Sequence, residues 1–169
     1  MKKFMIILFS MAVLSACGDN EKESLSKEFD DLMAQNDSIQ KVHSEFTSAH
    51  EQLKQNHSSI SQQLETMQVS DSSYFEQMAQ YEVVLKKHEG MLTGHEEMMK
   101  GHQDLKNDFG NLSSDEMKAQ ISKMQEVHDE IMNDHSSMKS EHEEMMKTHD
   151  EIRKNLIDSN QPDEMNAES

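Results

Sequence analysis

The chain has few of the residues that stabilise many small proteins. It contains one cysteine, one proline and no tryptophan, and only 16 Lys and Arg residues against 33 Asp and Glu residues. A single cysteine excludes an internal disulfide, so the fold has to be stabilised by packing. The formal net charge of −17 disfavours nucleic acids and anionic lipid surfaces as partners and favours cations.

Sequence signals of catalysis are also missing. The chain has no glycine-rich phosphate-binding loop and no serine or cysteine nucleophile at a strand-to-helix turn. It also lacks an Asp-x-Asp-x-Asp-Gly calcium loop, so its many carboxylates are expected on solvated surfaces. We therefore expect a protein that is not an enzyme.

Long apolar runs are absent as well. The stretch from Phe4 to Leu14 follows a basic start and is shorter than the roughly 20 apolar residues that cross a bilayer. It leads into the small-residue sequence Leu14-Ser15-Ala16-Cys17. This N-terminus resembles the signal peptide of bacterial lipoproteins, with a lipobox at these four residues. The resemblance implies cleavage before Cys17, lipidation of Cys17 and anchoring to a bacterial membrane in the cell envelope.

The acidic residues just after Cys17 resemble the export signal of surface lipoproteins in some Gram-negative groups. This implies the outer membrane or the cell surface rather than the inner membrane. The predicted organisation is a signal peptide at 1–16, a lipidated tether at 17–24, a coiled coil at 25–158 and a disordered tail at 159–169.

What the chain does have is histidine at a fixed spacing. All ten histidines lie in three runs with a spacing of seven residues: His43, His50, His57; His88, His95, His102; and His128, His135, His142, His149. An apolar residue follows three positions later at each step of all three runs, which is the pattern of positions a and d of a heptad. High charge and low hydrophobicity are also typical of disorder, but a sustained apolar stripe predicts a buried helical face.

The apolar stripe is interrupted twice, and a sequence typical of a helix N-terminus follows each interruption. Ser73 with Glu76, and Ser113 with Glu116, have the spacing of capping boxes that open helices. We therefore predict helices at about 20–68, 73–110 and 114–158. Because short turns make neighbouring helices antiparallel, the predicted fold is an all-α, long, up-down-up three-helix coiled-coil bundle.

The heptads also predict which residues share a layer. Position a meets position d in an antiparallel pair, and we placed histidine at position a in all three helices. One type of layer then has two histidines around a residue of the middle helix: His43, Met98, His128; His50, Met91, His135; and His57, Val84, His142. The other type has one histidine between apolar residues: Ile39, His102, Met124; Phe46, His95, Ile131; and Leu53, His88, Met138.

Two of these layers offer imidazole, thioether and imidazole, a ligand set that suits monovalent copper or silver. The His-x-x-Met pairs within residues 88–149 resemble motifs of periplasmic silver- and copper-resistance proteins. The resemblance implies soft-metal binding. The candidate ligands are His43, His50, His57, His88, His95, His102, His128, His135, His142, Met91, Met98, Met138 and Met145.

The same pattern has two other interpretations. Heptad duplication propagates a core histidine, and methionine at position d is often a flexible core filler. The main expectation is therefore a lipid-anchored, extracytoplasmic coiled coil with a structural or interaction role, which binds a protein partner or itself. Copper or silver binding is the first alternative. The second is a pH-responsive bundle that loosens as pH falls through the range where histidine titrates.

Overall fold

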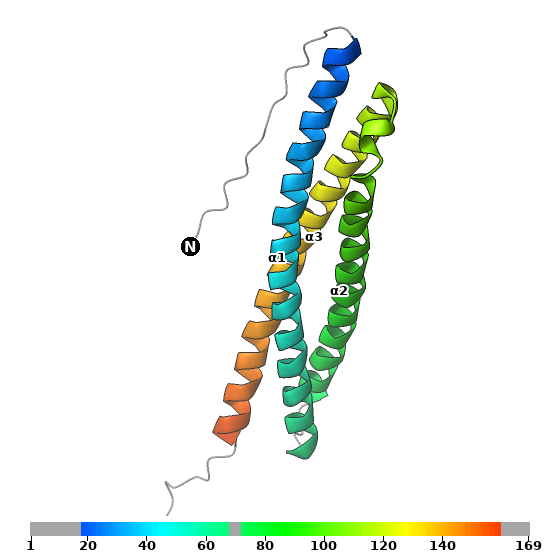
Figure 1. Ribbon diagram of the computed structural model, residues 1–169. Helices are drawn as coiled ribbons and strands as arrows, with labels where there is room; N and C mark the ends of the chain where they lie inside the picture. Colours follow the sequence, from blue (N-terminus) through cyan, green and yellow to red (C-terminus); the bar gives the residue numbers. More distant parts are fainter. Residues whose placement is uncertain (1–17, 68–71, 160–169) are drawn as a thin grey trace, which may run out of the picture.

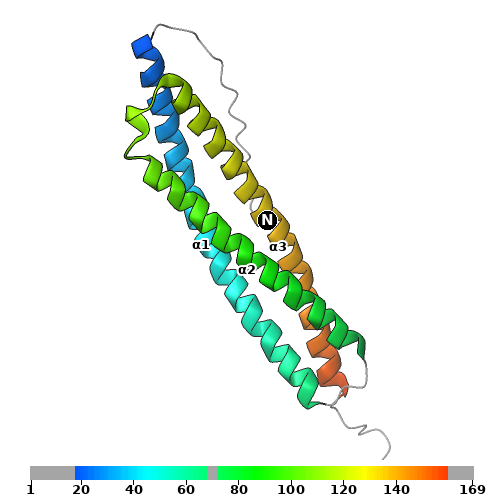
Figure 2. The same ribbon diagram turned by 90° about the vertical axis from the view of Figure 1, so that its right-hand side faces the viewer.

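The structure is a computed structural model that describes residues 18–67 and 72–159, and these residues form three long helices (Figure 1). The helices are α1 (Gly18–Thr66), α2 (Ser72–Leu105) and α3 (Ser114–Ser159), with a short 3-10 helix, η1 (Phe109–Asn111), between α2 and α3. In Figures 1 and 2, α1 and α3 run in the same direction and α2 runs in the opposite direction. The predicted all-α, up-down-up three-helix bundle is confirmed.

Several sequence predictions fall outside the described residues. The signal peptide at 1–16, the lipidation of Cys17 and the tail beyond Ser159 therefore stay predictions. The segment 18–24, expected to be a tether, belongs to α1 instead. Lys22 Nζ donates a 2.8 Å hydrogen bond to the carbonyl of Leu112, and Glu21 lies 2.6 Å from Lys118 Nζ. These contacts attach the start of α1 to the beginning of α3.

The α2–α3 connection begins earlier than the sequence suggested. α2 ends at Leu105 rather than near residue 110, and i to i+3 hydrogen bonds such as the 3.1 Å bond from Asp108 N to Leu105 O tighten the chain there. Phe109 is turned into the core, where its ring stacks on Phe29 with centroids 3.8 Å apart. The burial of this aromatic ring explains why the straight helix does not continue.

The capping box predicted at the start of α3 is confirmed. The backbone N–H of Ser113 donates to Glu116 Oε2 at 2.8 Å, and the backbone N–H of Glu116 donates to Ser113 Oγ at 3.4 Å. The two bonds satisfy N–H groups that the helix itself leaves unpaired.

The core is apolar at both ends and rich in histidine between them. One end cluster contains Leu25, Phe29, Leu32, Met33, Phe109, Met117, Ile121 and Met124, and the other contains Ile60, Leu64, Met78, Ile152 and Leu156. All ten histidines are buried, with at most 8% of their surface exposed. Small apolar clusters lie among them, such as Ile39 with Met99 and Ile131, and Leu53 with Leu85 and Met145. The hydrophobic ends therefore stabilise a polar central core.

The predicted register of the helices is wrong. In the part of α2 that carries the histidines, the buried apolar residues are Leu85, Leu92 and Met99, whereas Val84, Met91 and Met98 are only half-buried. Each buried residue precedes a histidine by three positions, so the histidines of α2 occupy position d and not position a. Because a meets d between antiparallel helices, the histidines of α2 meet the histidines of α1 and α3.

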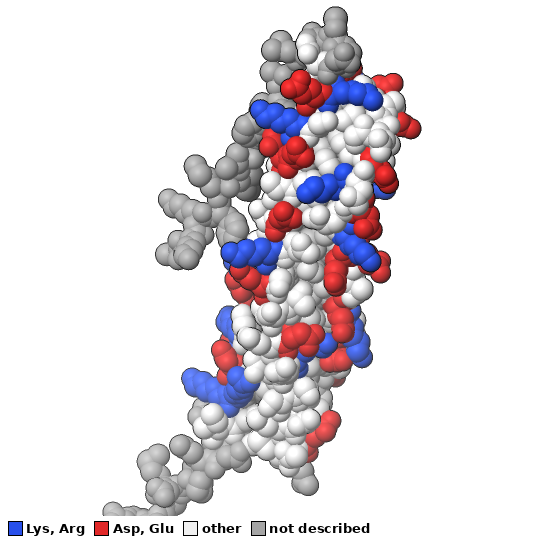
Figure 3. Space-filling model, in the orientation of Figure 1, with Lys and Arg blue, Asp and Glu red and all other residues white. Residues whose placement is uncertain are grey.

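The surface is charged but mixed. On the face shown in Figure 3, acidic and basic side chains alternate along the length of the bundle. Lys54, for example, lies 3.2 Å from Glu51 and 3.1 Å from Glu89. Exposed pairs of this kind contribute about 0.2–1 kcal/mol each, so they add little to what the core supplies.

Candidate metal centre

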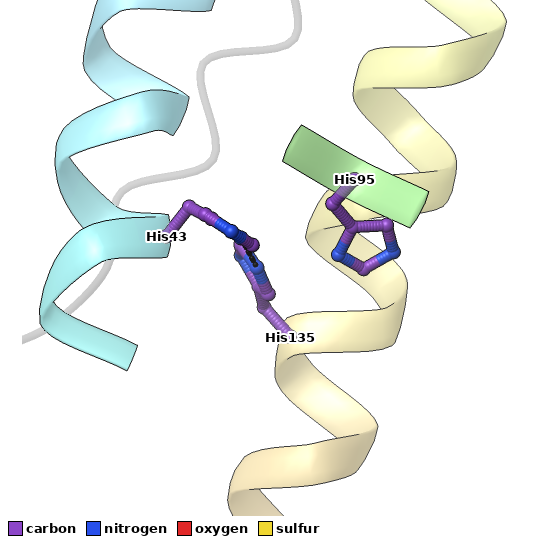
Figure 4. Close-up of side chains that lie close together, drawn as sticks. All are labelled: His43, His95 and His135. Carbon is purple, nitrogen blue, oxygen red and sulfur yellow. Dashed lines mark hydrogen bonds between the residues drawn. The ribbon is translucent and has the colours of Figure 1, made fainter. Parts of the chain in front are cut away.

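Two layers of the core each contain three histidines, one from each helix. The first layer is His43 of α1, His95 of α2 and His135 of α3, and the second is His50, His88 and His142. Within each layer one ring nitrogen of every histidine lies within 4.8 Å of the others. Figure 4 shows the three rings of the first layer converging from three helices. All six side chains are buried, so each layer is closed to solvent.

The first layer has two buried nitrogens without a hydrogen-bond partner among the described residues, His95 Nδ1 and His135 Nδ1. His43 Nδ1 lies 3.1 Å from His135 Nε2, so one of these rings donates a hydrogen bond to the other. His95 Nε2 lies 3.0 Å from Asp134 Oδ2. Because a carboxylate only accepts, the proton of neutral His95 resides on Nε2. His95 Nδ1 then carries a lone pair, and it is buried with no hydrogen-bond partner among the described residues.

The second layer has more contacts than protons can satisfy. His88 Nε2 donates to Glu141 Oε2, which leaves a lone pair on His88 Nδ1. His142 Nε2 lies 3.1 Å from both His88 Nδ1 and His50 Nδ1. One proton on His142 Nε2 makes one well-aligned hydrogen bond, so one contact among the three nitrogens stays unfavourable. A cation between them would interact favourably with all three lone pairs.

An aromatic ring separates the two layers. The Phe46 ring stacks on His135 with centroids 5.3 Å apart and on His142 with centroids 5.1 Å apart. Phe46 therefore packs between an imidazole of one layer and an imidazole of the next.

The histidines that α1 and α3 contribute to the two layers are neutral at neutral pH. Burial is the largest cause that lowers the pKa of His135 and of His142 to about 4, and nearby histidines lower it further. Burial also lowers the pKa of His43 and of His50 below the ordinary histidine value. A neutral imidazole is the form that coordinates a metal ion, so burial prepares these rings for coordination.

One further layer lies on each side of these two layers. Each of these outer layers contains two histidines and one other residue. Toward the α2–α3 turn, His102 and His128 share a layer with Asn36, whose Oδ1 accepts a 3.1 Å hydrogen bond from His102 Nδ1. Toward the other end, His57 Nδ1 lies 3.2 Å from His149 Nε2, and the Tyr81 ring centroid lies 5.9 Å from that of His149. Asn36 and Tyr81 therefore take the place of a third histidine.

The structure regroups the predicted ligands. His43 and His128, expected in one layer, lie in different layers, as do His50 with His135 and His57 with His142. His95 and His88 occupy the middle-helix positions that were expected for Met98 and Met91. Met145 packs in an apolar cluster with Leu53 and Leu85, and Met138 is fully buried. The mixed layers of imidazole and thioether predicted from the sequence do not form.

The sequence reasoning missed the carboxylates Asp134 and Glu141. Each directly precedes a histidine of α3 in the sequence, but it accepts a hydrogen bond from a histidine of α2. The signal was present: Asp134 precedes His135 and Glu141 precedes His142, whereas Val127 and Thr148 stand before His128 and His149. Acids therefore occur beside the two three-histidine layers and not at the same position in the other two.

Comparison with protein-family models, with curated proteins and with solved structures found no match for this chain. Among the described residues, no helix contains a segment both long and apolar enough to cross a bilayer.

Proposed function

We propose that this protein binds divalent transition-metal ions in the core of its helical bundle, at two closed sites. The ligands are His43, His95 and His135 in one site and His50, His88 and His142 in the other. The observation that supports this most is the convergence of three buried imidazoles in each layer. Imidazole nitrogen suits zinc, copper and nickel ions, which sets the class of metal.

The spacing of the nitrogens is close to what such an ion requires. Zinc binds histidine nitrogen at about 2.0–2.1 Å, which places two nitrogens of a tetrahedral site about 3.3 Å apart. His43 Nδ1 and His135 Nε2 are already 3.1 Å apart, and the free nitrogen of the third ring completes a set that lies within 4.8 Å. A small rotation of side chains would bring all three into coordination range.

The carboxylates provide the outer part of each site. A histidine that binds a metal commonly donates its other N–H to a carboxylate, which fixes the tautomer and raises the basicity of the ligand. Asp134 performs this role for His95, and Glu141 performs it for His88. Each carboxylate also brings a negative charge close to the buried cation.

The metal class differs from the copper or silver expected from the sequence. That expectation depended on a methionine sulfur between two imidazoles, because soft sulfur selects soft ions. Because a third imidazole occupies that position, we propose that the sites bind divalent ions such as zinc and copper. Monovalent silver serves as the comparison.

The location proposed for this activity is the cell envelope. The lipobox residues Leu14 to Cys17 support lipidation of Cys17 and attachment of the protein to a bacterial membrane, and the acidic residues that follow support the outer membrane or the cell surface. The net charge of −17 supports an affinity for cations from the surrounding medium.

Metal titration of the full-length protein tests the proposal. We expect two tightly bound zinc or copper ions per chain and weaker binding of silver. The double variant His135→Leu, His142→Leu should lose both ions, because it removes one ligand from each site. The matched variant Met91→Leu, Met98→Leu should keep them, because these methionines lie outside the layers.

Three results would contradict the proposal. The first is no uptake of any ion by the folded protein, which would favour a purely structural role. The second is two bound ions in the histidine variant. The third is loss of the ions in the methionine variant, which would restore the soft-metal interpretation.

A further inference from the structure

The layer formed by Asn36, His102 and His128 has two histidines in the geometry of the closed sites. The ring centroids of His102 and His128 are 5.1 Å apart. The corresponding distances are 5.2 Å for His95 with His135 and 5.0 Å for His88 with His142. The α2 and α3 contributions to this layer therefore match those of the closed sites, and only the α1 contribution differs.

Asn36 sets the protonation of this layer. Its side-chain oxygen only accepts hydrogen bonds, so the 3.1 Å contact with His102 Nδ1 places the proton of neutral His102 on that nitrogen. His102 Nε2 is then the nitrogen with a free lone pair. Asn36 thus fixes the tautomer of His102 as Glu141 fixes that of His88, but at the other ring nitrogen, so the free lone pair is on Nε2 in His102 and on Nδ1 in His88.

His128 is the least satisfied polar side chain of the core. Only 4% of its surface is exposed, and both ring nitrogens are buried without a hydrogen-bond partner among the described residues. Unpaired buried nitrogens are unfavourable, and a metal ion bound to the nitrogen of His128 that carries the lone pair would satisfy one of the two.

Each of the two histidines of this layer lines a groove at the surface of the bundle. His102 lines a groove of about 480 Å³ together with Asp104 and Asp108. His128 lines a second groove of about 460 Å³ together with Asp129. None of the six histidines of the closed layers lines either groove.

We propose that His102 and His128 form a third metal site, which binds a divalent transition-metal ion that keeps water in its remaining coordination positions. Asn36 is a positioning residue that holds the tautomer of His102. The inference rests on the proposed function, since it assigns the same class of ion. Because water reaches the ion, this site exchanges metal faster than the two closed sites.

The test is the release of zinc from the full-length protein to a coloured chelator. We expect three zinc ions at saturation, of which one is released at least tenfold faster than the other two. His128→Leu should remove the fast ion and keep the two slow ions. His135→Leu with His142→Leu should remove the two slow ions and keep the fast one. Circular dichroism of each variant verifies that the helices are intact, and His102→Leu provides a second variant of the open site.

The positioning role of Asn36 can be tested separately. Asn36→Leu should weaken binding of the fast ion about tenfold, whereas Asn36→Asp should restore it, because aspartate also accepts the proton of His102 Nδ1. Equal effects of the two substitutions would overturn the positioning role.

The remaining outcomes separate the two proposals. Two slow ions with no fast ion, or a fast ion unaffected by His128→Leu and His102→Leu, would overturn the third site and leave the closed sites standing. A fast ion that depends on His128, without any slow ions, would overturn the closed sites alone. Absence of all bound zinc would overturn both proposals.

Discussion

His95 and Asp134 are joined by a 3.0 Å contact between His95 Nε2 and Asp134 Oδ2 that links α2 to α3. This contact turns the free nitrogen of His95 toward His43 and His135 and away from the carboxylate. The same relationship recurs one heptad along, between His88 and Glu141. The carboxylates thereby fix the tautomer of one histidine in each layer before any ligand arrives.

The first prediction concerns this carboxylate. Asp134→Ala should weaken metal binding at the first closed site by about 10- to 100-fold, since the tautomer of His95 is no longer fixed. The second closed site should keep its affinity. Calorimetric titration with zinc measures both, and Glu130→Ala, an exposed acid on the same helix, serves as the control. Equal loss of affinity in the control would show that only surface charge matters.

The second prediction concerns pH in the absence of metal. Burial lowers the pKa of His128, His135, His142 and His149 to about 4 in the folded protein. The unfolded chain takes up protons near pH 6.5, so stability is complete above that pH and falls as pH decreases toward 4. Each histidine protonated only in the unfolded state lowers the free energy of unfolding by up to about 1.4 kcal/mol per pH unit.

Urea unfolding of the metal-free protein at pH 7.5, 6 and 5 measures this effect. We expect the midpoint to fall with each step toward acid. A midpoint that does not change over this range would mean that the histidines are accessible to protons in the folded state.

The third prediction is that the metal sites reduce the stability of the metal-free bundle. Replacing His43 and His135 together by leucine should raise the free energy of unfolding by about 1–3 kcal/mol, because buried polar groups are replaced by apolar groups of similar volume. Ile131→Ala, in the adjacent apolar cluster, should instead lower it by about 2–5 kcal/mol. Chemical denaturation in the presence of a chelator distinguishes the two. A double leucine variant that is less stable than the parent would contradict this prediction, because it would show that the two histidines stabilise the metal-free bundle.

The fold could be predicted from the sequence, but the register of the middle helix could not. The heptad spacing of His43, His50 and His57 indicates a buried helical face without any knowledge of its partners. In α2, adjacent apolar residues such as Met91 and Leu92 compete for the core. Leu92 is buried and Met91 is half-buried, and the choice depends on packing against two other helices at once. That choice decides whether histidine meets histidine or an apolar residue.

Other parts of the site depend on contacts between helices that no local pattern reveals. Asp134 is next to His135 in the sequence, yet it binds the ring of His95, 39 residues away. Asn36 occupies the heptad position before His43, and its role as the acceptor for His102 appears only once α1 and α2 are paired.

The fourth prediction concerns the glycines of α2. A Cβ atom placed on Gly90 or Gly101 would meet no atom within 4 Å, so these glycines do not serve a close approach of helices. Gly90→Ala and Gly101→Ala should each stabilise the protein by about 1 kcal/mol, because alanine favours the helix more than glycine. Thermal unfolding followed by circular dichroism measures the gain. A loss of stability in either variant would indicate that the helix needs flexibility there.

X-ray absorption spectroscopy at the zinc edge, on protein loaded with two equivalents of zinc, identifies the atoms bound to the metal. If the three histidines of each closed layer bind zinc, the first shell contains three imidazole nitrogens at about 2.0–2.1 Å from the zinc. A shell with sulfur at about 2.3 Å, or one made of oxygen alone, would contradict the proposed sites.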